Sequence, residues 1–291
     1  MGGRNSRQGS DLLFHTVNIV PWIFPKTTFD REERFVVCPS GTGGFGRRTM
    51  SPEVIHMDRV KWTVDENIAI LTMNSGENRL NIPFCNAMLQ ALGEIEQKTE
   101  VNALVVDAAD PKIWCNGMDL DWLLPAIKEK DPAVHEFFKI QDQLYRRVTF
   151  YPMITVAAVT GHAFAGGAIL ACAFDFRFMR TDRGFICFPE VDLKIPFLPY
   201  MDALIRRTFP MHLVFQAELT AHRFTALELE ECGAVRKACP TAESAVREAV
   251  AWAKTLNKGR DIVGTMKKIT NSDIGRLMDA TVHPDLGKLV D

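Results

Sequence analysis

Residues 156–190 read VAAVTGHAFAGGAILACAFDFRFMRTDRGFICFPE, and this stretch decides the fold of the chain. Its start belongs to an apolar run at 154–159 that is rich in β-branched residues, which predicts a buried strand. A loop of small residues follows at 160–167, and the apolar segment 168–173 predicts a helix packed on all sides. A strand, a glycine loop and a helix in this order place free backbone N–H groups at a helix N-terminus, where negative charge is stabilised.

The same stretch contains two candidates for chemistry. Gly166 and Gly167 have no side chains, so a ligand atom can approach their backbone amides closely. Glu190 follows among apolar neighbours, a setting that should raise its pKa. These neighbours are Phe185, Ile186, Phe188 and Ile195. An anion-binding amide and a carboxyl group are what is needed to remove a proton next to a carbonyl. Taken alone, the glycine pair also fits simple close packing, and Glu190 also fits an ordinary surface carboxylate.

A second motif, IWCNGMDL at residues 113–120, repeats this arrangement. It follows a predicted buried strand at 103–106 and leads into a predicted helix capped by Asp119. Two such units side by side can each direct one backbone N–H at a single oxygen, which makes an oxyanion hole. By itself, Asn116-Gly117 also fits an ordinary turn.

Composition indicates a globular protein. The chain has 291 residues, of which 47% are hydrophobic, and a formal net charge of −2, so its charge indicates neither nucleic acid nor a membrane surface as a partner. Its seven cysteines are scattered, without CxxC or zinc-ligand spacing, which predicts reduced thiols and no metal site. No apolar run reaches membrane-spanning length.

The chain divides into three parts by composition. We expect residues 1–56, rich in Gly, Arg, Ser and Pro, to be a disordered extension, or sequence ahead of a later start. A signal peptide is disfavoured because polar residues interrupt its apolar segment, and a transit peptide because acidic residues follow. Strands and helices alternate in a core domain at 57–222, and a helical region follows at 223–291. This order predicts an α/β fold.

Periodicity and capping residues predict individual elements in these parts. The predicted elements are a hairpin at 60–73, helices beginning at Asn81 and Asp131, and helices at 225–231, 241–257 and 261–278. Asp175 and Arg177 are predicted to form the polar face of a strand. Lys267 and Lys268 are predicted to lie on a solvated basic face, with contact to phosphates as the alternative.

Together, these motifs resemble the enoyl-CoA hydratase/isomerase (crotonase) superfamily over about residues 58–280. WCNGMDL matches that family's F-[AS]-[AG]-G-x-D-[LI], GHAFAGGA matches G-x-[AC]-x-G-G-G, and ICFPE matches F-x-x-P-E. The resemblance implies a ClpP/crotonase-like α/β fold of repeated ββα units with a C-terminal helical trimerisation region. It also implies an acyl-CoA substrate, no cofactor besides the coenzyme A of that substrate, and a homotrimer or dimer of trimers.

The resemblance also implies roles for individual residues. The N–H groups of Met118 and Gly166 would form the oxyanion hole for the thioester carbonyl, and Glu190 would carry the proton. The loop at 78–81 would cup the adenine with its backbone. The residues predicted to bind substrate are Asn78, Arg79, Leu80, Asn116, Gly117, His162, Gly167 and Ile169. For His162, a structural histidine with satisfied hydrogen bonds is the alternative.

The carboxylates indicate the reaction. Hydratases of this family carry a second glutamate at the position of Ile169, and isoleucine cannot bind or activate water. The remaining single acid, Glu190, resembles the pattern of the Δ3,Δ2-enoyl-CoA isomerases, which shift a 3-enoyl-CoA double bond to the 2-trans position. The alternatives are a hydratase, a thioester hydrolase and a non-catalytic CoA-binding scaffold. The chain departs from the family at Ala165 and Lys194, where relatives carry glycine.

The resemblance predicts the compartment only in general terms. It implies a cytoplasmic enzyme in a prokaryote and a mitochondrial or peroxisomal one in a eukaryote.

Overall fold

The main sheet contains six strands in the order β1-β2-β3-β5-β7-β9. A computed structural model describes residues 59–283 of the chain, so the predicted extension at 1–56 lies outside the described residues. The strands are β1 (Val60–Asp65), β2 (Ile68–Met73), β3 (Ala103–Ala108), β5 (Ile154–Val159), β7 (Phe176–Arg180) and β9 (Lys237–Cys239). The first two form an antiparallel hairpin, as predicted, and all other neighbours are parallel.

A second, smaller sheet was not predicted. It consists of β4 (Ile113–Cys115), β6 (His162–Phe164) and β8 (Ile186–Cys187), which are all parallel. The segment that contains β6 was expected to be loop, because strands of two or three residues are too short to show a period. This sheet matters for the site, since β4 leads into α3 (Leu120–Lys128) and β6 leads into α5 (Gly166–Ala173).

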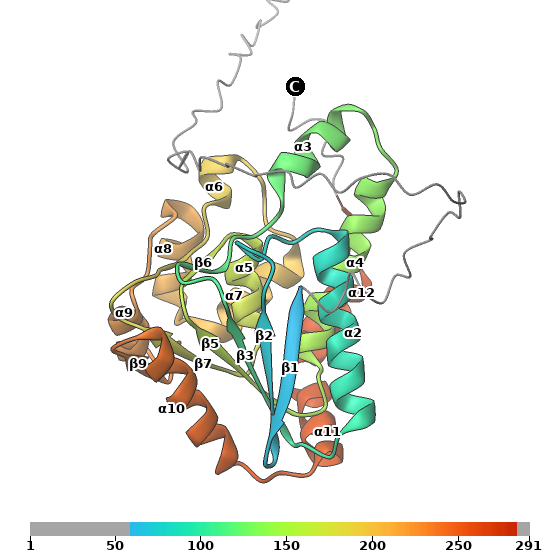
Figure 1. Ribbon diagram of the computed structural model, residues 1–291. Coiled ribbons are helices and arrows are strands. Elements are labelled where there is room, and N and C mark those ends of the chain that lie inside the picture. The colour runs from blue at the N-terminus through green and yellow to red at the C-terminus, as the bar shows by residue number, and fades with distance from the viewer. Residues whose placement is uncertain (1–58, 284–291) are drawn as a thin grey trace, which may run out of the picture. The chain divides into compact units, whose positions relative to one another are not determined.

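Helices cover both faces of the main sheet (Figure 1). The remaining helices are α2 (Ile82–Lys98), α4 (Ala133–Thr149), α6 (Glu190–Leu193), α7 (Pro199–Thr208), α8 (Met211–Thr220), α9 (Ala226–Glu231), α10 (Ala242–Lys254), α11 (Arg260–Thr270) and α12 (Ser272–Asp279). One face is covered by α10, whose buried alanines pack on strand residues such as Val105, Val156 and Phe178. The other face holds the larger core, to which α2, α4, α5 and α7 contribute. No described helix is long and apolar enough to cross a membrane.

The starts of α2, α9 and α10 follow local sequence signals, whereas the predicted cap of α3, Asp119, makes no capping hydrogen bond. The side chain of Asn81 accepts a hydrogen bond from the Phe84 amide at 3.0 Å, which confirms the predicted cap of α2. Thr225 and Thr241 each form a capping box, at the starts of α9 and α10. The predicted last helix is instead two helices that meet at Asn271, whose buried side chain accepts a hydrogen bond from Arg207 at 2.9 Å.

Two basic residues correct the sequence predictions. Arg177 is buried rather than on a polar strand face, and its guanidinium donates to three main-chain carbonyls at 2.7–3.1 Å. Lys267 is also buried, not solvated: its Nζ lies 2.6 Å from Asp175 Oδ2 and donates to Met153 O at 2.7 Å. The prediction for Lys267 failed because its buried partners are far away in sequence. The prediction for Arg177 failed because main-chain carbonyls, two of them within six residues, accept its hydrogen bonds in the interior.

The C-terminal part of the chain takes part in the main sheet. β9 pairs with β7, and α10 lies against β3, β5 and β7. The residues on the two sides of the predicted boundary at 222/223 therefore share one sheet, and the division into two domains stays a prediction.

Candidate functional site

The two glycine turns lie directly against each other. A β-carbon placed on Gly117 would lie 3.1 Å from the amide nitrogen of Gly166 and 2.8 Å from Phe164 O. The amide of Met118 follows Gly117, and Gly166 is the first residue of α5. Helical hydrogen bonding begins only with the amides of Ala168 and Ile169, both of which donate to Ala165 O. The first amides of α5 are therefore available to an outside acceptor.

A neighbouring loop fixes the segment that carries Met118. The amide of Leu80 donates to Gly117 O at 2.7 Å, and the amide of Asp119 donates to Leu80 O at 3.0 Å. Leu80 and Met118 thus form a parallel bridge. The side chain of Asn78 is fully buried, and its Nδ2 donates to Trp114 O at 3.0 Å. The backbone amide of Asn78 donates to Ser75 O at 3.0 Å, so this residue holds the loop through both its side chain and its backbone.

A polar cluster holds the outer side of this loop. Arg79 forms ion pairs with Glu77 at 2.8 Å and Asp121 at 2.6 Å. The amide Nδ2 of Asn116 donates to Glu77 Oε2 at 3.0 Å, whereas its Oδ1 is buried without a donor. The predicted substrate-binding residues at 78–80 and 116–117 are therefore brought together, and their role in binding stays a prediction.

The start of α5 requires an unusual backbone. Ala165 has φ 48 and ψ −127, a conformation that favours glycine. This is the residue that replaces the family's first glycine. Gly167 is required for a different reason, since a β-carbon there would lie 2.2 Å from Cys115 O. It allows α5 to pack directly on β4.

Glu190 begins the short helix α6 and is buried, with 6% of its surface exposed. Burial raises the pKa of its carboxyl to about 8, partly opposed by a hydrogen bond from its own backbone and increased by the nearby charge of Glu218. Its Oε2 is buried and has no hydrogen-bond partner among the described residues. The group can therefore exchange a proton near neutral pH, as the apolar sequence around it predicted.

A second carboxyl group, Glu218 on α8, was not predicted. It is half-buried, and its Oε1 has no donor among the described residues. Burial and the adjacent carboxyl of Asp202 raise the pKa of Glu218 to about 7. A neighbouring carboxyl group disfavours the ionised form, so Glu218 holds its proton more tightly than an isolated glutamate. No sequence signal distinguishes Glu218 from a surface residue of α8.

The other two predicted substrate-binding residues have different surroundings. Ile169 is 2% exposed and belongs to the hydrophobic core. The ring of His162 lies between Phe164 and Phe185, at centroid distances of 5.0 and 5.5 Å. Its Nδ1 is buried without a partner among the described residues, and both interpretations of His162, as a substrate contact and as a structural histidine, stay predictions. Burial lowers the pKa of His162, and nearby arginines lower it further.

One further residue contacts the site from α4. Tyr145 is fully buried, and its hydroxyl donates to Gly166 O at 2.9 Å. The sequence placed its neighbours on the apolar face of this helix and gave no reason to select Tyr145.

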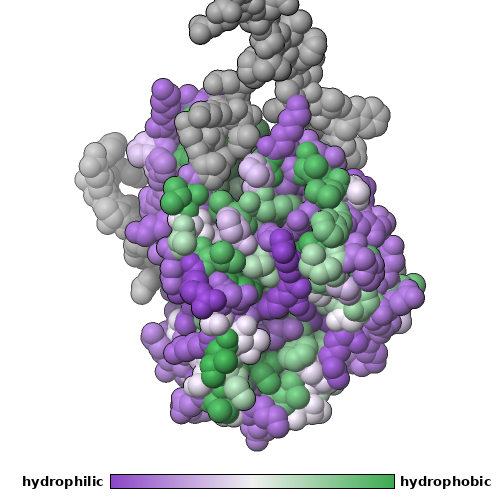
Figure 2. All heavy atoms as spheres, turned by 180° about the vertical axis from the view of Figure 1, so that it is seen from behind, coloured by the Kyte–Doolittle hydropathy of each residue, from purple (hydrophilic) through white to green (hydrophobic). Residues whose placement is uncertain are grey.

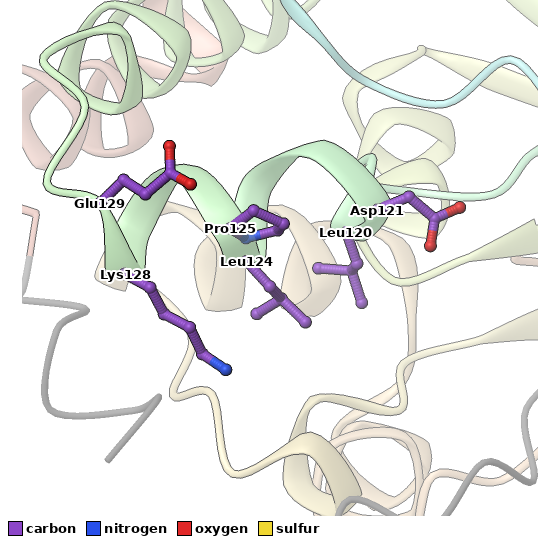
Figure 3. A pocket seen from close by; sticks show the side chains of 6 residues that line it. All are labelled: Leu120, Asp121, Leu124, Pro125, Lys128 and Glu129. Carbon is purple, nitrogen blue, oxygen red and sulfur yellow. The ribbon is translucent and has the colours of Figure 1, made fainter.

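A cavity of about 440 Å³ lies beside α3, close to Met118 in sequence. Figure 3 shows the side chains of Leu120, Leu124 and Lys128 extending to the same side of the helix. Leu120 and Leu124 give this surface an apolar part on the side of Met118, and Lys128 carries an ammonium group at its other end. Its lining residues are Leu120, Asp121, Leu124, Pro125, Lys128 and Glu129.

Comparison with known proteins finds relatives of one family. The family model for enoyl-CoA hydratase/isomerase matches residues 63–287. Enoyl-CoA delta isomerase 2, peroxisomal, from Arabidopsis thaliana is 31% identical over 48% of this chain and 60% of its own length. Enoyl-CoA delta isomerase 3 from the same plant is 25% identical over 75% of this chain and 94% of its own. Enoyl-CoA hydratase, mitochondrial, from Pongo abelii is 29% identical over 62% of this chain and 59% of its own length.

Solved structures show the same fold. A probable enoyl-CoA hydratase from Mycobacterium tuberculosis superposes with a TM-score of 0.70. The two chains are 24% identical, and the match covers 77% of this chain and 92% of the other.

Proposed function

The chain belongs to the enoyl-CoA hydratase/isomerase family, and from this premise we propose that it is an enoyl-CoA isomerase that moves the double bond of a 3-enoyl-CoA to the 2-trans position. The family acts on acyl-CoA thioesters, and the described residues have the α/β crotonase fold. Coenzyme A enters as part of the substrate, and we propose no further cofactor.

One observation carries this proposal: a single buried carboxyl group, Glu190, has an oxygen without a partner among the described residues and a pKa raised to about 8. As a carboxylate it takes a proton from C2, and the electron pair moves into the thioester carbonyl. The N–H groups of Met118 and Gly166 stabilise the resulting dienolate oxygen. Glu190 then returns the proton to C4, which leaves the double bond between C2 and C3.

The residue at 169 supports isomerisation over hydration. Ile169 is buried in the core and offers no group that can hold water. General acid–base catalysis contributes about 10²–10⁴-fold, and one oxyanion donor contributes about 2.7–4 kcal/mol. One acid and two amides therefore provide substantial acceleration for a proton shift. Three Arabidopsis relatives are named enoyl-CoA delta isomerases, which supports the same reaction.

Hydration is the second candidate, because Glu218 provides a second carboxyl group whose charge reaches Glu190. A water molecule held between two carboxylates is what hydration requires, and some relatives are named hydratases. Thioester hydrolysis would need a similarly activated water. A CoA-binding scaffold without catalysis would give no reason for a buried, unpartnered Glu190.

The test uses 3-enoyl-CoAs of several chain lengths and follows the formation of conjugated 2-enoyl-CoA, with hydration of 2-enoyl-CoA measured in the same preparation. We expect isomerisation to exceed hydration, and Glu190→Gln to lower isomerisation by at least about 10²-fold. Asp192→Asn is the matched control, since Asp192 lies in the same short helix but is exposed. Near-normal turnover in Glu190→Gln, or faster hydration than isomerisation, would contradict the proposal.

We also propose that the protein forms homotrimers, alone or as a pair. Two helices carry exposed apolar stripes: Met211, Phe215 and Leu219 on α8, and Ile262, Met266 and Ile269 on α11. Figure 2 shows that apolar side chains gather in patches on the face turned away in Figure 1. Contact between two unlike surfaces builds a closed ring when the rotation suits. Light scattering tests this: Phe215→Asp should dissociate the assembly, whereas Thr220→Asp, a change at an exposed polar residue on the opposite side of the same helix, should not.

Two of the Arabidopsis relatives are named as peroxisomal, which supports a peroxisomal location within the range of compartments expected from the sequence. Microscopy of the tagged full chain in its native cells tests this.

A further inference from the structure

The hydroxyl of Tyr145 lies where a side chain on Gly166 would be. A β-carbon on Gly166 would lie 2.8 Å from Tyr145 Oη, 3.0 Å from Leu80 Cδ1 and 3.7 Å from Gly117 Cα. The same hydroxyl donates to Gly166 O at 2.9 Å. The tyrosine thus fills the space that a side chain would take and also bonds to the glycine's carbonyl.

The hydrogen bond from Tyr145 reaches a part of the backbone with high conformational freedom. Gly166 and Gly167 form the first turn of α5, and glycine loses more conformational entropy on ordering than any other residue. The carbonyl of Gly166 has two lone pairs, of which a regular helix uses one. The tyrosine's hydrogen bond comes from outside the helix and fixes the peptide that follows Gly166. The Gly166 amide belongs to the preceding peptide, next to Ala165 with its unusual conformation, so Gly166 is constrained on both sides.

The surroundings keep this hydroxyl in its donor form. Burial raises the pKa of Tyr145 well above its usual range, and the nearby groups Cys115, Cys85, Glu190 and Asp142 raise it further. The phenol therefore stays protonated at any working pH and can donate.

We propose that Tyr145 is a positioning residue of the oxyanion hole: its hydroxyl, bonded to Gly166 O, aims the Gly166 amide at the developing negative charge. This inference rests on the proposed function, because it requires a thioester oxygen at that amide. A tyrosine that serves packing alone would not affect the polarisation of a bound carbonyl.

The chain offers a matched control. Tyr151 is also fully buried, and its hydroxyl donates to Leu92 O at 2.8 Å, away from both glycine turns. Tyr145→Phe and Tyr151→Phe therefore remove the same atom from equally buried sites. Any general cost in stability should appear in both variants, whereas an effect on the carbonyl should appear only in the first.

The experiment uses the full chain with hexanoyl-CoA whose thioester carbonyl is enriched in carbon-13. In the unmodified protein, the carbonyl resonance should move downfield on binding, because amide donors polarise it. In Tyr145→Phe this shift should shrink. With a 3-enoyl-CoA, kcat should fall about 10-fold and KM should change less than about two-fold, because the interaction matters mainly in the transition state. Tyr151→Phe should leave the carbonyl shift, kcat and KM unchanged.

The outcomes separate the inference from the proposed function. A downfield shift in the unmodified protein that Tyr145→Phe retains in full overturns the role of Tyr145 and leaves the proposed function intact. Absence of any shift and of isomerisation in the unmodified protein overturns both. If Tyr145→Phe does not fold, 3-fluorotyrosine at position 145 decides instead, since it keeps the hydroxyl and makes it a stronger donor. The carbonyl shift should then stay or grow, and a loss overturns the inference.

Discussion

Gly117 and Gly166 lie so close together that a β-carbon on Gly117 would be 3.1 Å from the Gly166 amide nitrogen. Gly117 also has φ 75, where a side chain adds strain of about 1–2 kcal/mol. Gly117→Ala should therefore push the two turns apart and lower kcat for isomerisation by at least about 10²-fold, the cost of one oxyanion donor.

The control for this change is Gly93→Ala in α2, where no atom lies within 4 Å of the added carbon. Alanine is the better helix former by about 0.8–1 kcal/mol, so this variant should be more stable and fully active. Steady-state kinetics and thermal unfolding of both variants check the prediction. Normal kcat in a folded Gly117→Ala variant would show that the contact is not needed.

The pKa of Glu190 predicts how activity depends on pH. Only the carboxylate can accept the C2 proton, and burial raises the pKa of Glu190 to about 8. The ratio kcat/KM should therefore rise with pH and level off above that value, falling about tenfold per pH unit on the acid side. A pH series with a slow 3-enoyl-CoA substrate checks this. A midpoint near 4, the value of an exposed glutamate, would mean that the carboxyl group is solvated in the working enzyme.

Glu218 should influence this profile. Its negative charge is one of the causes that raise the pKa of Glu190, so Glu218→Gln should lower that pKa and move the midpoint of kcat/KM to lower pH. The rate on the alkaline plateau should change little if Glu218 only acts through its charge. Glu231→Gln, at an exposed position on α9, is the control. A collapse of hydration alone in Glu218→Gln would instead assign this carboxyl to water activation.

The sequence predicted those parts of the fold that local signals determine. The hairpin, the Asn81 cap and the strand before the glycine turn all have such a signal within a few residues. The same holds for the raised pKa of Glu190, which its apolar sequence neighbours predicted and which burial causes. Periodicity, capping chemistry and composition act over short distances, and the structure agrees with them there.

Features made by contacts between distant segments could not be predicted. Tyr145 reaches Gly166 from α4, and Glu218 meets Asp202 across two helices. Lys267 was placed at the surface because a lone lysine is normally solvated, and its partner Asp175 is far away in sequence. In the sequence, a buried polar residue cannot be distinguished from a surface one unless its partner is known.

Ala165 offers a test of backbone strain at the site. Its φ of 48 disfavours a side chain, so Ala165→Gly should stabilise the fold by about 0.5–1 kcal/mol after the entropy cost of glycine is subtracted. Activity should be kept, because the Gly166 amide is unchanged. Lys194→Gly should also stabilise the fold, because Lys194 has φ 58. Ala163→Gly in β6 is the control and should destabilise, and denaturant titrations compare the three variants. A loss of stability in Ala165→Gly would show that the alanine methyl packs usefully.

The ion pair between Lys267 and Asp175 should be required for stability. Lys267 is 7% exposed, and its Nζ lies 2.6 Å from Asp175 Oδ2, an oxygen that also accepts a hydrogen bond from the Thr155 amide at 2.8 Å. Lys267→Met would leave this fixed carboxylate without its cation and should cost about 3–5 kcal/mol of unfolding free energy. Lys268→Met, on the exposed side of the same helix, should change stability by less than about 0.5 kcal/mol. Adding Asp175→Asn to Lys267→Met should restore part of the loss, because the uncompensated charge is then gone. Equal effects of the two lysine variants would mean that water reaches the pair and screens it.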